Sequence, residues 1–227
     1  MRYPGGKNGP GVAQIIINQI PPHRVYVEPF LGSGAVLRAK RPAENDIGID
    51  LDWEALSGVR QALEAAGRQA QLVHQDALEW LAAYGWQGDE FVYCDPPYLG
   101  SVRSGPIYRH EFMSPEQHLR LLHLLKRLPC PVAISGYDSD LYRMRLSDWR
   151  VVRYPAMTRG GLVWESLWCN YPEPDRLHDV AFVGANRRKR QDLKRKKERW
   201  LMRLAKMEAR ERQAILTAIE EWTRAQA

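Results

Sequence analysis

Short apolar runs alternate with longer amphipathic stretches over residues 25–183. The runs are rich in β-branched and aromatic residues and end at Gly, Pro or Asp, which is typical of buried strands. We expect strands at 25–28, 47–50, 91–94 and 131–135. Helices are expected between them, at 33–40, 52–66, 76–84 and 115–128. The alternation predicts an α/β fold with a doubly wound, mainly parallel sheet.

The pattern changes toward the end of the chain. Three later runs, at 150–154, 163–170 and 179–183, are expected to form an antiparallel edge of the sheet. Residues 187–207 almost lack helix breakers, and apolar positions recur there near helical spacing: Leu193, Trp200, Leu204 and Met207. A second apolar set follows: Ile215, Ile219 and Trp222. We therefore expect an α/β domain over 1–185 and a helical extension, of two helices or one bent helix, over 186–227.

Charge distinguishes these two parts. Residues 186–227 hold 14 Lys and Arg against 6 Asp and Glu, a net charge of +8. The remaining 19 basic and 21 acidic residues give the first 185 residues a net charge of −2. Such an asymmetry favours a polyanionic partner, most often nucleic acid, with an acidic membrane surface as the weaker alternative.

Length and cysteine content narrow the class of protein. A chain of 227 residues can bury a full hydrophobic core without disulfide or metal staples. No apolar run approaches the length of a membrane span, and the N-terminus does not resemble a signal peptide. Three scattered cysteines are too few for a disulfide framework or a four-ligand zinc site. We expect a soluble intracellular protein without a metal.

The first chemical motif is a strand, a glycine turn and a helix start, spanning residues 25–37. Gly32 and Gly34 allow tight turning and a close approach of the backbone to a ligand. Asp50 ends the next strand, 16 positions after Gly34, where a partner of a ribose hydroxyl lies in nucleotide-type sites. A purely structural turn is the alternative.

The second motif, Asp95-Pro96-Pro97-Tyr98, directly follows the expected strand at 91–94. A carboxylate at the carboxyl end of such a strand faces the crevice where these sheets bind ligands, and the two prolines stiffen the backbone. Asp95 and the Pro96 carbonyl could accept hydrogen bonds from an exocyclic amino group while Tyr98 stacks on the base. The alternative is a simple turn.

Together these motifs resemble the S-adenosylmethionine-dependent amino methyltransferases of DNA, most closely the Dam-like adenine-N6 family, prophage forms included. The resemblance covers roughly residues 1–175 and implies a Rossmann-like methyltransferase sheet. It implies a cofactor site for S-adenosylmethionine formed by Tyr3, Pro4, Gly5, Gly6, Lys7, Glu28, Pro29, Phe30, Leu31, Gly32, Ser33, Gly34, Asp50 and Asp76. It also implies the cytoplasm of a bacterial or phage-infected cell, and a restriction-linked or orphan role.

The implied reaction is direct methyl transfer to the N6 amine of a flipped adenine in double-stranded DNA, with catalysis by positioning and electrostatics. The implied catalytic residues are Asp95, Pro96, Pro97 and Tyr98. Lys7 is expected near this pocket, but the sequence does not reveal its partner.

One departure from the family concerns DNA recognition. Dam carries its DNA-reading domain between the two motifs, whereas only 60 residues separate Gly34 from Asp95 here. Recognition is therefore expected from a basic loop at 99–112, the tail or a second protomer. The expected DNA-binding residues are Arg103, Arg109, Arg187, Arg188, Lys189, Arg190, Lys194, Arg195, Lys196 and Lys197. A solvated helix face is the alternative for the tail cluster, whose apolar side could form a homodimer.

Four functions compete. Cytosine-N4 methylation uses the same chemistry, but Asp95 favours adenine over the Ser more usual in cytosine enzymes. Methylation of RNA or of protein glutamine usually accompanies Asn-Pro-Pro-Tyr, so Asp95 argues against both. A catalytically silent DNA-binding module is disfavoured by the intact motifs.

Other conspicuous residues are expected to be structural. Cys130 lies far from the glycine motif and is not expected to be a nucleophile, and Cys94 is expected to be a small buried strand residue. His118 and His123 do not have the spacing of a zinc pair. Strand alternation favours core packing over base stacking for three aromatic residues: Trp164, Trp168 and Tyr171.

Overall fold

The computed structural model describes residue 7 and residues 11–98, 114–158, 161–184 and 187–225. By contacts the chain divides into two compact units, Met1–Val180 and Ala181–Ala227, which are considered separately here.

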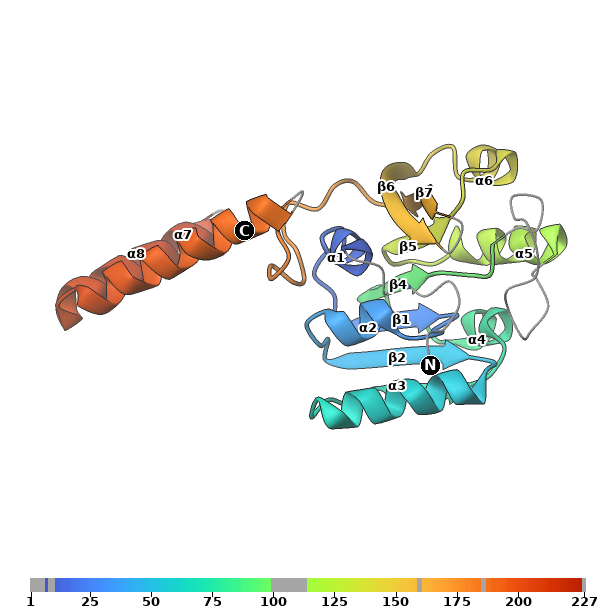
Figure 1. Cartoon of the computed structure of the whole chain (residues 1–227), viewed down its shortest axis with the longest axis horizontal. Helices are drawn as coiled ribbons and strands as arrows, with labels where there is room; N and C mark the ends of the chain where they lie inside the picture. Colours follow the sequence, from blue (N-terminus) through green and yellow to red (C-terminus); the bar gives the residue numbers. More distant parts are fainter. Residues whose placement is uncertain (1–6, 8–10, 99–113, 159–160, 185–186, 226–227) are drawn as a thin grey trace. The chain divides into compact units, whose positions relative to one another are not determined.

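The first unit is built on one seven-stranded sheet with the order β3-β2-β1-β4-β5-β7-β6 (Figure 1). The strands are β1 (Val25–Pro29), β2 (Asn45–Asp50), β3 (Gln71–His74), β4 (Glu90–Cys94), β5 (Val132–Gly136), β6 (Arg150–Thr158) and β7 (Gly161–Cys169). β1 to β5 pair in parallel, whereas β7 runs antiparallel to both β5 and β6. The predicted doubly wound, mainly parallel sheet with an antiparallel edge is confirmed.

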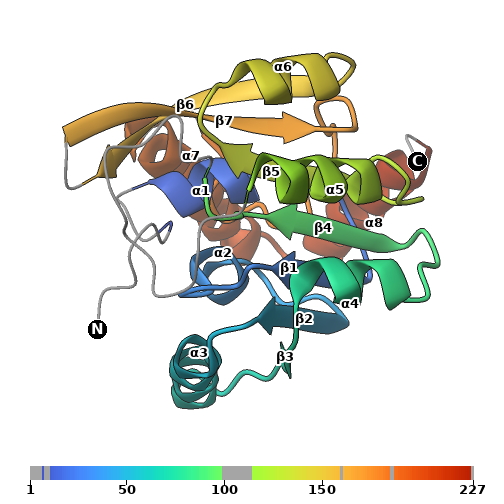
Figure 2. The same cartoon turned by 90° about the vertical axis from the view of Figure 1, so that its right-hand side faces the viewer.

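Helices cover both faces of this sheet. They are α1 (Val12–Ile17), α2 (Ala35–Ala39), α3 (Trp53–Ala65), α4 (Ala77–Ala83), α5 (Pro115–Leu125) and α6 (Asp140–Arg145). α1, α2 and α3 lie on one face, and α4, α5 and α6 lie on the other (Figure 2). α5 begins as expected: the Ser114 side chain accepts from the Gln117 backbone N–H, Gln117 returns the bond, and Pro115 occupies the first turn.

The antiparallel edge extends beyond the rest of the sheet. β7 pairs with β5 only from Ser166 to Cys169, whereas its first residues, from Gly161 to Glu165, pair with β6 alone. Because β7 is antiparallel to β5, this overhang lies at the carboxyl edge of the parallel strands. It therefore brings Glu165 to the edge where α/β sheets bind their ligands.

One expected strand does not form in the structure, and three elements are present that we did not locate from the sequence. No strand forms over 179–183. Instead, the Asp179 carboxylate accepts the Arg41 backbone N–H at 2.8 Å, and the His178 backbone N–H donates to the Ile20 carbonyl. The segment is thus fixed to the loop after α2, and β6 ends the sheet. α1, β3 and α6 were not among the elements that we located from the sequence.

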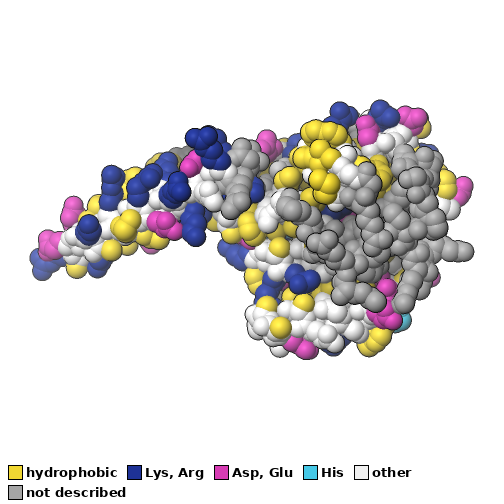
Figure 3. Space-filling view, viewed as in Figure 1, with side chains coloured by type: hydrophobic (Ala, Val, Ile, Leu, Met, Phe, Trp, Pro, Cys, Tyr) yellow, Lys and Arg dark blue, Asp and Glu magenta, His cyan; other side chains and the backbone are white. Residues whose placement is uncertain are grey.

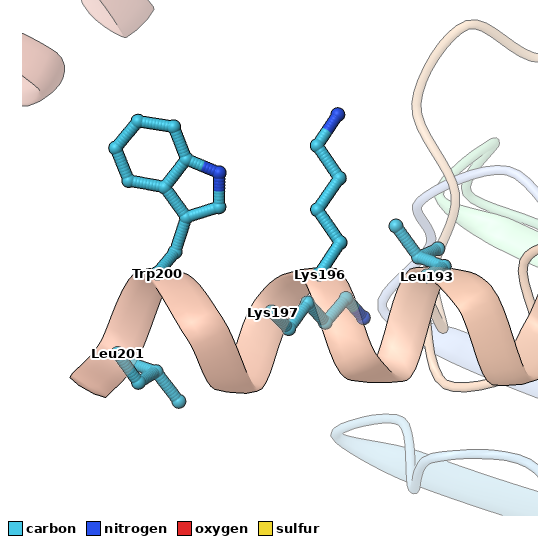
Figure 4. Close-up of a pocket in the computed structure, with 5 residues that line it drawn as sticks. All are labelled: Leu193, Lys196, Lys197, Trp200 and Leu201. Atoms are coloured by element: carbon cyan, nitrogen blue, oxygen red, sulfur yellow. The ribbon is translucent and has the colours of Figure 1, made fainter. Parts of the chain in front are cut away.

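The second unit contains α7 (Arg187–Lys206) and α8 (Ala209–Ala225), separated by Met207 and Glu208. Of the two expected forms, two helices or one bent helix, the structure has two helices. The apolar side chains of α7 do not form one buried stripe: Leu193 is half-buried, whereas Trp200 and Leu201 are exposed. Figure 4 shows Trp200, Lys196 and Leu193 projecting from one side of α7 and Leu201 from another. α8 has no buried residue.

Candidate active site

The carboxyl ends of β2, β1 and β4 lie side by side, because the three strands are parallel and adjacent. Each end carries one predicted motif: Asp50 on β2, the glycine turn after β1, and Asp95 after β4. The fold therefore brings together residues that are distant in sequence, as expected for a doubly wound sheet.

The glycine turn has a strained, left-handed backbone. Phe30, Gly32 and Gly34 have φ angles of 61°, 51° and 59°. Such angles suit glycine but cost an ordinary residue such as Phe30 about 1–2 kcal/mol. A Cβ added to Gly34 would lie 3.1 Å from the Val59 side chain of α3, so this glycine also permits close packing. The backbone is thus held in an unusual shape at the sheet edge.

Asp50 links the end of β2 to this turn. Its Oδ2 accepts the Gly32 backbone N–H at 2.7 Å, and its Oδ1 accepts the Asp52 backbone N–H at 2.8 Å. Burial raises the pKa of Asp50, against the lowering effect of these backbone donors. A half-buried carboxylate at this position is a suitable acceptor for a ligand hydroxyl.

Glu28 is buried beneath the same turn. Its Oε2 accepts the Tyr26 hydroxyl at 2.8 Å and the Leu37 backbone N–H at 2.9 Å. Burial raises the pKa of Glu28 to about 8, although both hydrogen bonds oppose the shift. In this structure Glu28 connects β1 to the start of α2.

Asp76 has a local structural role. Its Oδ1 accepts the backbone N–H groups of Leu78 and Glu79, so it caps the N-terminus of α4. The cap places its half-buried side chain just after β3.

Asp95 lies in a cluster of polar side chains after β4. Its Oδ1 lies 2.9 Å from the Lys7 ammonium and accepts the Tyr98 hydroxyl at 3.1 Å. Among the residues that the structure describes, none donates a hydrogen bond to Oδ2. The Asp95 side chain keeps 16 % exposure, so a second acceptor oxygen remains open to an incoming group.

Lys7 joins this cluster to β7. Its buried ammonium lies 2.8 Å from Oε2 of Glu165 and also contacts the Tyr98 hydroxyl. Glu165 Oε2 further accepts the Tyr154 hydroxyl at 3.0 Å and lies 3.1 Å from the Tyr98 hydroxyl, whose one proton it shares with Asp95. Burial lowers the pKa of Lys7, but Asp95 and Glu165 outweigh it and hold that pKa above its usual range. Lys7 is therefore a cation between two carboxylates.

The motif around Asp95 is otherwise compact. Pro96 is buried and Pro97 is half-buried. The Tyr98 ring is buried and meets the Tyr137 ring in an edge-to-face contact, with centroids 4.7 Å apart. The ring is thus fixed beside Asp95 by both its hydroxyl and its edge.

Some predicted site residues lie outside the described part of the chain. They are Tyr3, Pro4, Gly5, Gly6, Arg103 and Arg109. The side chain of Arg187 also lies outside it, whereas Arg188, Lys189, Arg190 and Lys194 to Lys197 are on α7 and mostly exposed.

Most residues expected to be structural are buried. Cys94, Cys130 and Trp168 are in the core, and the Nδ1 of buried His118 lies 2.9 Å from the Tyr142 hydroxyl. Trp164 corrects the prediction, since 65 % of its side chain is exposed. The reason is the overhang of β7, which carries Trp164 past the helices that cover Trp168. Within the described residues, no cluster suited to a metal is present.

The sequence did not reveal Glu165 or Tyr154 as members of the site. They pair across the β6–β7 hairpin and face Lys7 together. An acidic residue within an apolar strand is the only signal that could have drawn attention to Glu165.

Comparisons with known proteins were made at the levels of fold and sequence. The fold resembles precorrin 8W decarboxylase from Methanobacterium thermoautotrophicum, at 15% identity and a TM-score of 0.50, over 75% of this chain and 94% of that one. It also resembles a conserved hypothetical protein from Streptococcus pyogenes, at 13% identity and a TM-score of 0.50, over 74% and 99% of the two chains. At these identities the likeness concerns the fold alone. No curated protein matches the sequence significantly.

A family model gives the more specific result. Residues 54–157 match the model for D12 class N6 adenine-specific DNA methyltransferase, a span that includes Asp95, Pro96, Pro97 and Tyr98. The glycine turn, Lys7 and Glu165 lie outside the matched span. The matched domain contains the motif whose carboxylate lies open at the sheet edge. Residues 54–157 of this chain are thus similar to the D12 class of N6 adenine-specific DNA methyltransferases, over 104 of its 227 residues.

Proposed function

We propose that the chain methylates adenine N6 in duplex DNA after the base has been flipped out of the helix, with Asp95 and the Pro96 carbonyl as hydrogen-bond acceptors for the amine. The observation that supports this assignment is the open Oδ2 of Asp95. Oδ1 is already engaged by Lys7 and Tyr98, so the carboxylate is fixed and keeps one acceptor for a ligand.

The chemistry needs such an acceptor because the lone pair of the adenine amine is delocalised into the ring. Hydrogen bonds from the amine to Asp95 and Pro96 favour its tetrahedral form and make the nitrogen a better nucleophile. The N–C bond then forms as the S–C bond breaks, and the nitrogen releases a proton. Catalysis comes from positioning and electrostatics, without a covalent enzyme intermediate.

S-adenosylmethionine is the methyl donor, and it supplies a methyl group on a positively charged sulfur when bound. The residues at the first strand ends fit this molecule: Asp50 offers a half-buried carboxylate for ribose hydroxyls, beside a glycine turn that exposes backbone. We assign the cofactor to this edge, with Glu28 to Gly34, Asp50 and Asp76 lining it and the N-terminal residues Tyr3 to Lys7 closing it.

Tyr98 is assigned to the flipped base. Stacking on an aromatic ring contributes about 1–3 kcal/mol per base. The Tyr98 ring is buried, meets the Tyr137 ring at its edge and has the Lys7 ammonium over one face, 4.9 Å from its centroid. Pro96 and Pro97 keep the backbone rigid between this ring and Asp95.

The tail is assigned to the DNA backbone. Most basic residues of α7 are exposed, and Lys196 and Lys197 lie on the turn of the helix before Trp200 (Figure 4). In the space-filling view, Lys and Arg side chains are spread along the surface of the helical unit (Figure 3). The exposed apolar residues of α7 and α8, among them Trp200, Ile219 and Trp222, are available for a second copy of the chain. We therefore assign DNA holding and homodimer formation to this unit.

The test is direct. Unmethylated duplex DNA is incubated with the protein and S-adenosylmethionine labelled in its methyl group, and the nucleosides are separated. Labelled N6-methyl-2′-deoxyadenosine is expected with the natural chain and absent with Asp95→Ala, whose cofactor affinity should persist. Label in N4-methyl-2′-deoxycytidine would instead support the cytosine enzyme. DNA binding without label would support a silent module.

A further inference from the structure

We infer that Glu165 of β7 is a positioning residue of the methyl-transfer site: it shares the Lys7 ammonium with Asp95, which fixes Asp95 and leaves its charge available to the target amine. The inference rests on the proposed role of Asp95 and adds a residue that lies outside both motifs and outside the family match.

The first support is the set of contacts that converge on Glu165. Its buried Oε2 accepts from the Lys7 ammonium at 2.8 Å and the Tyr154 hydroxyl at 3.0 Å, and lies 3.1 Å from the Tyr98 hydroxyl, whose single proton it shares with Asp95 Oδ1. Buried carboxylates are rare unless their acceptors are satisfied. Glu165 therefore holds Lys7 and Tyr98 in place relative to the sheet.

The second support is the geometry at Asp95. The Lys7 ammonium has three N–H donors, and its contacts are Asp95, Glu165 and Tyr98. Lys7 and Tyr98 both contact the same oxygen of Asp95, Oδ1. This arrangement fixes the rotation of the carboxylate and leaves Oδ2 without a donor among the described residues. Without Glu165, neither Lys7 nor Tyr98 would be anchored to β7.

The third support is the charge of the cluster. One ammonium lies between two carboxylates, so one negative charge remains in excess. If Glu165 were neutral, Lys7 would compensate Asp95 alone, and Asp95 would become a weaker acceptor for the amine. With Glu165 charged, the ammonium of Lys7 neutralises only part of the negative charge of Asp95. Its value to the reaction is electrostatic as well as geometric.

Other charged or hydrogen-bonding groups face the Lys7–Glu165 pair from the neighbouring elements. From β4 and its continuation the cluster is faced by Asp95 and Tyr98, from β6 by Tyr154, and from the N-terminal segment by Lys7. The Tyr154 hydroxyl lies 3.3 Å from Ser135 Oγ, which continues the network into β5. Among the described residues, Glu165 is therefore the one other carboxylate that contacts both Lys7 and Tyr98, the two partners of Asp95.

The test compares Glu165→Gln with the natural chain in single-turnover methylation of unmethylated duplex DNA. Glutamine preserves size and one acceptor oxygen but removes the charge. The methylation rate is expected to fall about 10- to 100-fold, the effect typical of removing a group that orients a reacting side chain. The affinity for S-adenosylmethionine, measured by calorimetry, is expected to fall much less than the rate, because Lys7 is the one assigned cofactor residue that Glu165 contacts among the described residues.

The conservative variant Glu165→Asp separates positioning from a merely structural role. Aspartate keeps the negative charge beside Lys7, so Glu165→Asp should methylate faster than Glu165→Gln. A structural role predicts the reverse, since glutamine preserves the size of the side chain and aspartate does not. A natural rate in Glu165→Gln, or a Glu165→Asp variant no faster than Glu165→Gln, overturns the inference.

Asp46→Asn is the matched control. Asp46 forms another buried ion pair, with Lys40 at 2.5 Å, at the start of β2 and thus at the opposite edge of the sheet. Circular dichroism gives the folded fraction of the Asp46→Asn variant. That fraction should methylate at the natural rate. Asp95→Ala is measured beside it. Activity in Asp95→Ala contradicts the proposed function itself, whereas an inactive Asp95→Ala with a fully active Glu165→Gln contradicts the role of Glu165 alone.

Discussion

The carboxylate of Asp50 accepts a hydrogen bond from the backbone N–H of Gly32 at 2.7 Å, which ties the end of β2 to the turn after β1. The same carboxylate also accepts the Asp52 backbone N–H through its other oxygen. Each oxygen retains a second lone pair, so Asp50 can shape the turn and accept a ligand hydroxyl simultaneously.

Asp50→Ala should weaken binding of S-adenosylmethionine by about 1–3 kcal/mol, the cost of losing a buried acceptor. Calorimetry measures the change. Asp52→Ala is the control two residues away: it removes the N-cap of α3 and should lower stability while the cofactor affinity persists. Equal affinities in the natural chain and a folded Asp50→Ala would remove Asp50 from the cofactor site.

Substitutions of Tyr98 should separate its ring from its hydroxyl. Tyr98→Ala removes the stacking surface, so methylation should fall about 10- to 100-fold or more. Tyr98→Phe keeps the ring and loses only the hydroxyl contacts with Asp95 and Glu165, so it should retain more activity. Single-turnover methylation of duplex DNA measures both. The stacking role is wrong if the phenylalanine variant is as impaired as the alanine variant.

Glu28 should make stability depend on pH. Its pKa is raised to about 8 by burial, so the folded chain keeps a proton that the unfolded chain has released. Stability should therefore fall as pH rises from about 5 to 8, by up to about 1.4 kcal/mol per pH unit.

Glu28→Gln is neutral at every pH and should remove this part of the slope. Urea unfolding at pH 6 and pH 8 gives the difference. Glu54→Gln, on the exposed surface of α3, serves as the control and should leave the slope unchanged. An identical slope in the natural chain and in Glu28→Gln would show that Glu28 is not the group responsible.

Removal of the tail should affect DNA and cofactor differently. A chain ending at Gly184 should bind DNA far more weakly and with a shallower dependence on salt, because fewer phosphates are neutralised and fewer counterions are released. Its affinity for S-adenosylmethionine should persist. Fluorescence anisotropy at several salt concentrations measures the first effect, and calorimetry the second.

A full-length control isolates charge from the loss of the helices. Replacing Lys194, Arg195, Lys196 and Lys197 with glutamine should reduce DNA affinity and salt dependence but leave the mass in light scattering unchanged. If truncation alters neither DNA affinity nor mass, the tail has neither assigned role. A change in only one of the two assigns the tail to that role alone.

The sequence predicted the parts of the site that follow from local pattern. Asp95 and Asp50 each end a run of buried strand residues, and parallel strands bring such ends to one edge. Glycines in the turn after β1 were equally readable, because the left-handed backbone there needs them. The two tail helices follow from a long stretch without helix breakers.

The partners of Lys7 could not be predicted. Lys7 and Glu165 are 158 positions apart, and their contact depends on how far the β6–β7 hairpin extends past β5. Trp164 was misplaced for the same reason, since alternation within a strand predicts which residues share a face but not whether a helix covers that face. The 179–183 segment looked like a strand, but its polar residues are fixed to the loop after α2.

The pairing of Lys7 with Glu165 has a consequence for how activity arises during synthesis. The segment that carries Lys7 leaves the ribosome before β7, which is the last strand of the sheet to be synthesised. A nascent or prematurely terminated chain that lacks β7 also lacks Glu165, so Lys7 and Tyr98 are not anchored beside Asp95. Such a chain should not methylate DNA. The same dependence would allow the enzyme to be split into two polypeptides. A break between α6 and β6 would place Lys7 and Glu165 on separate polypeptides. Methylation activity would then report that the two parts have reassembled.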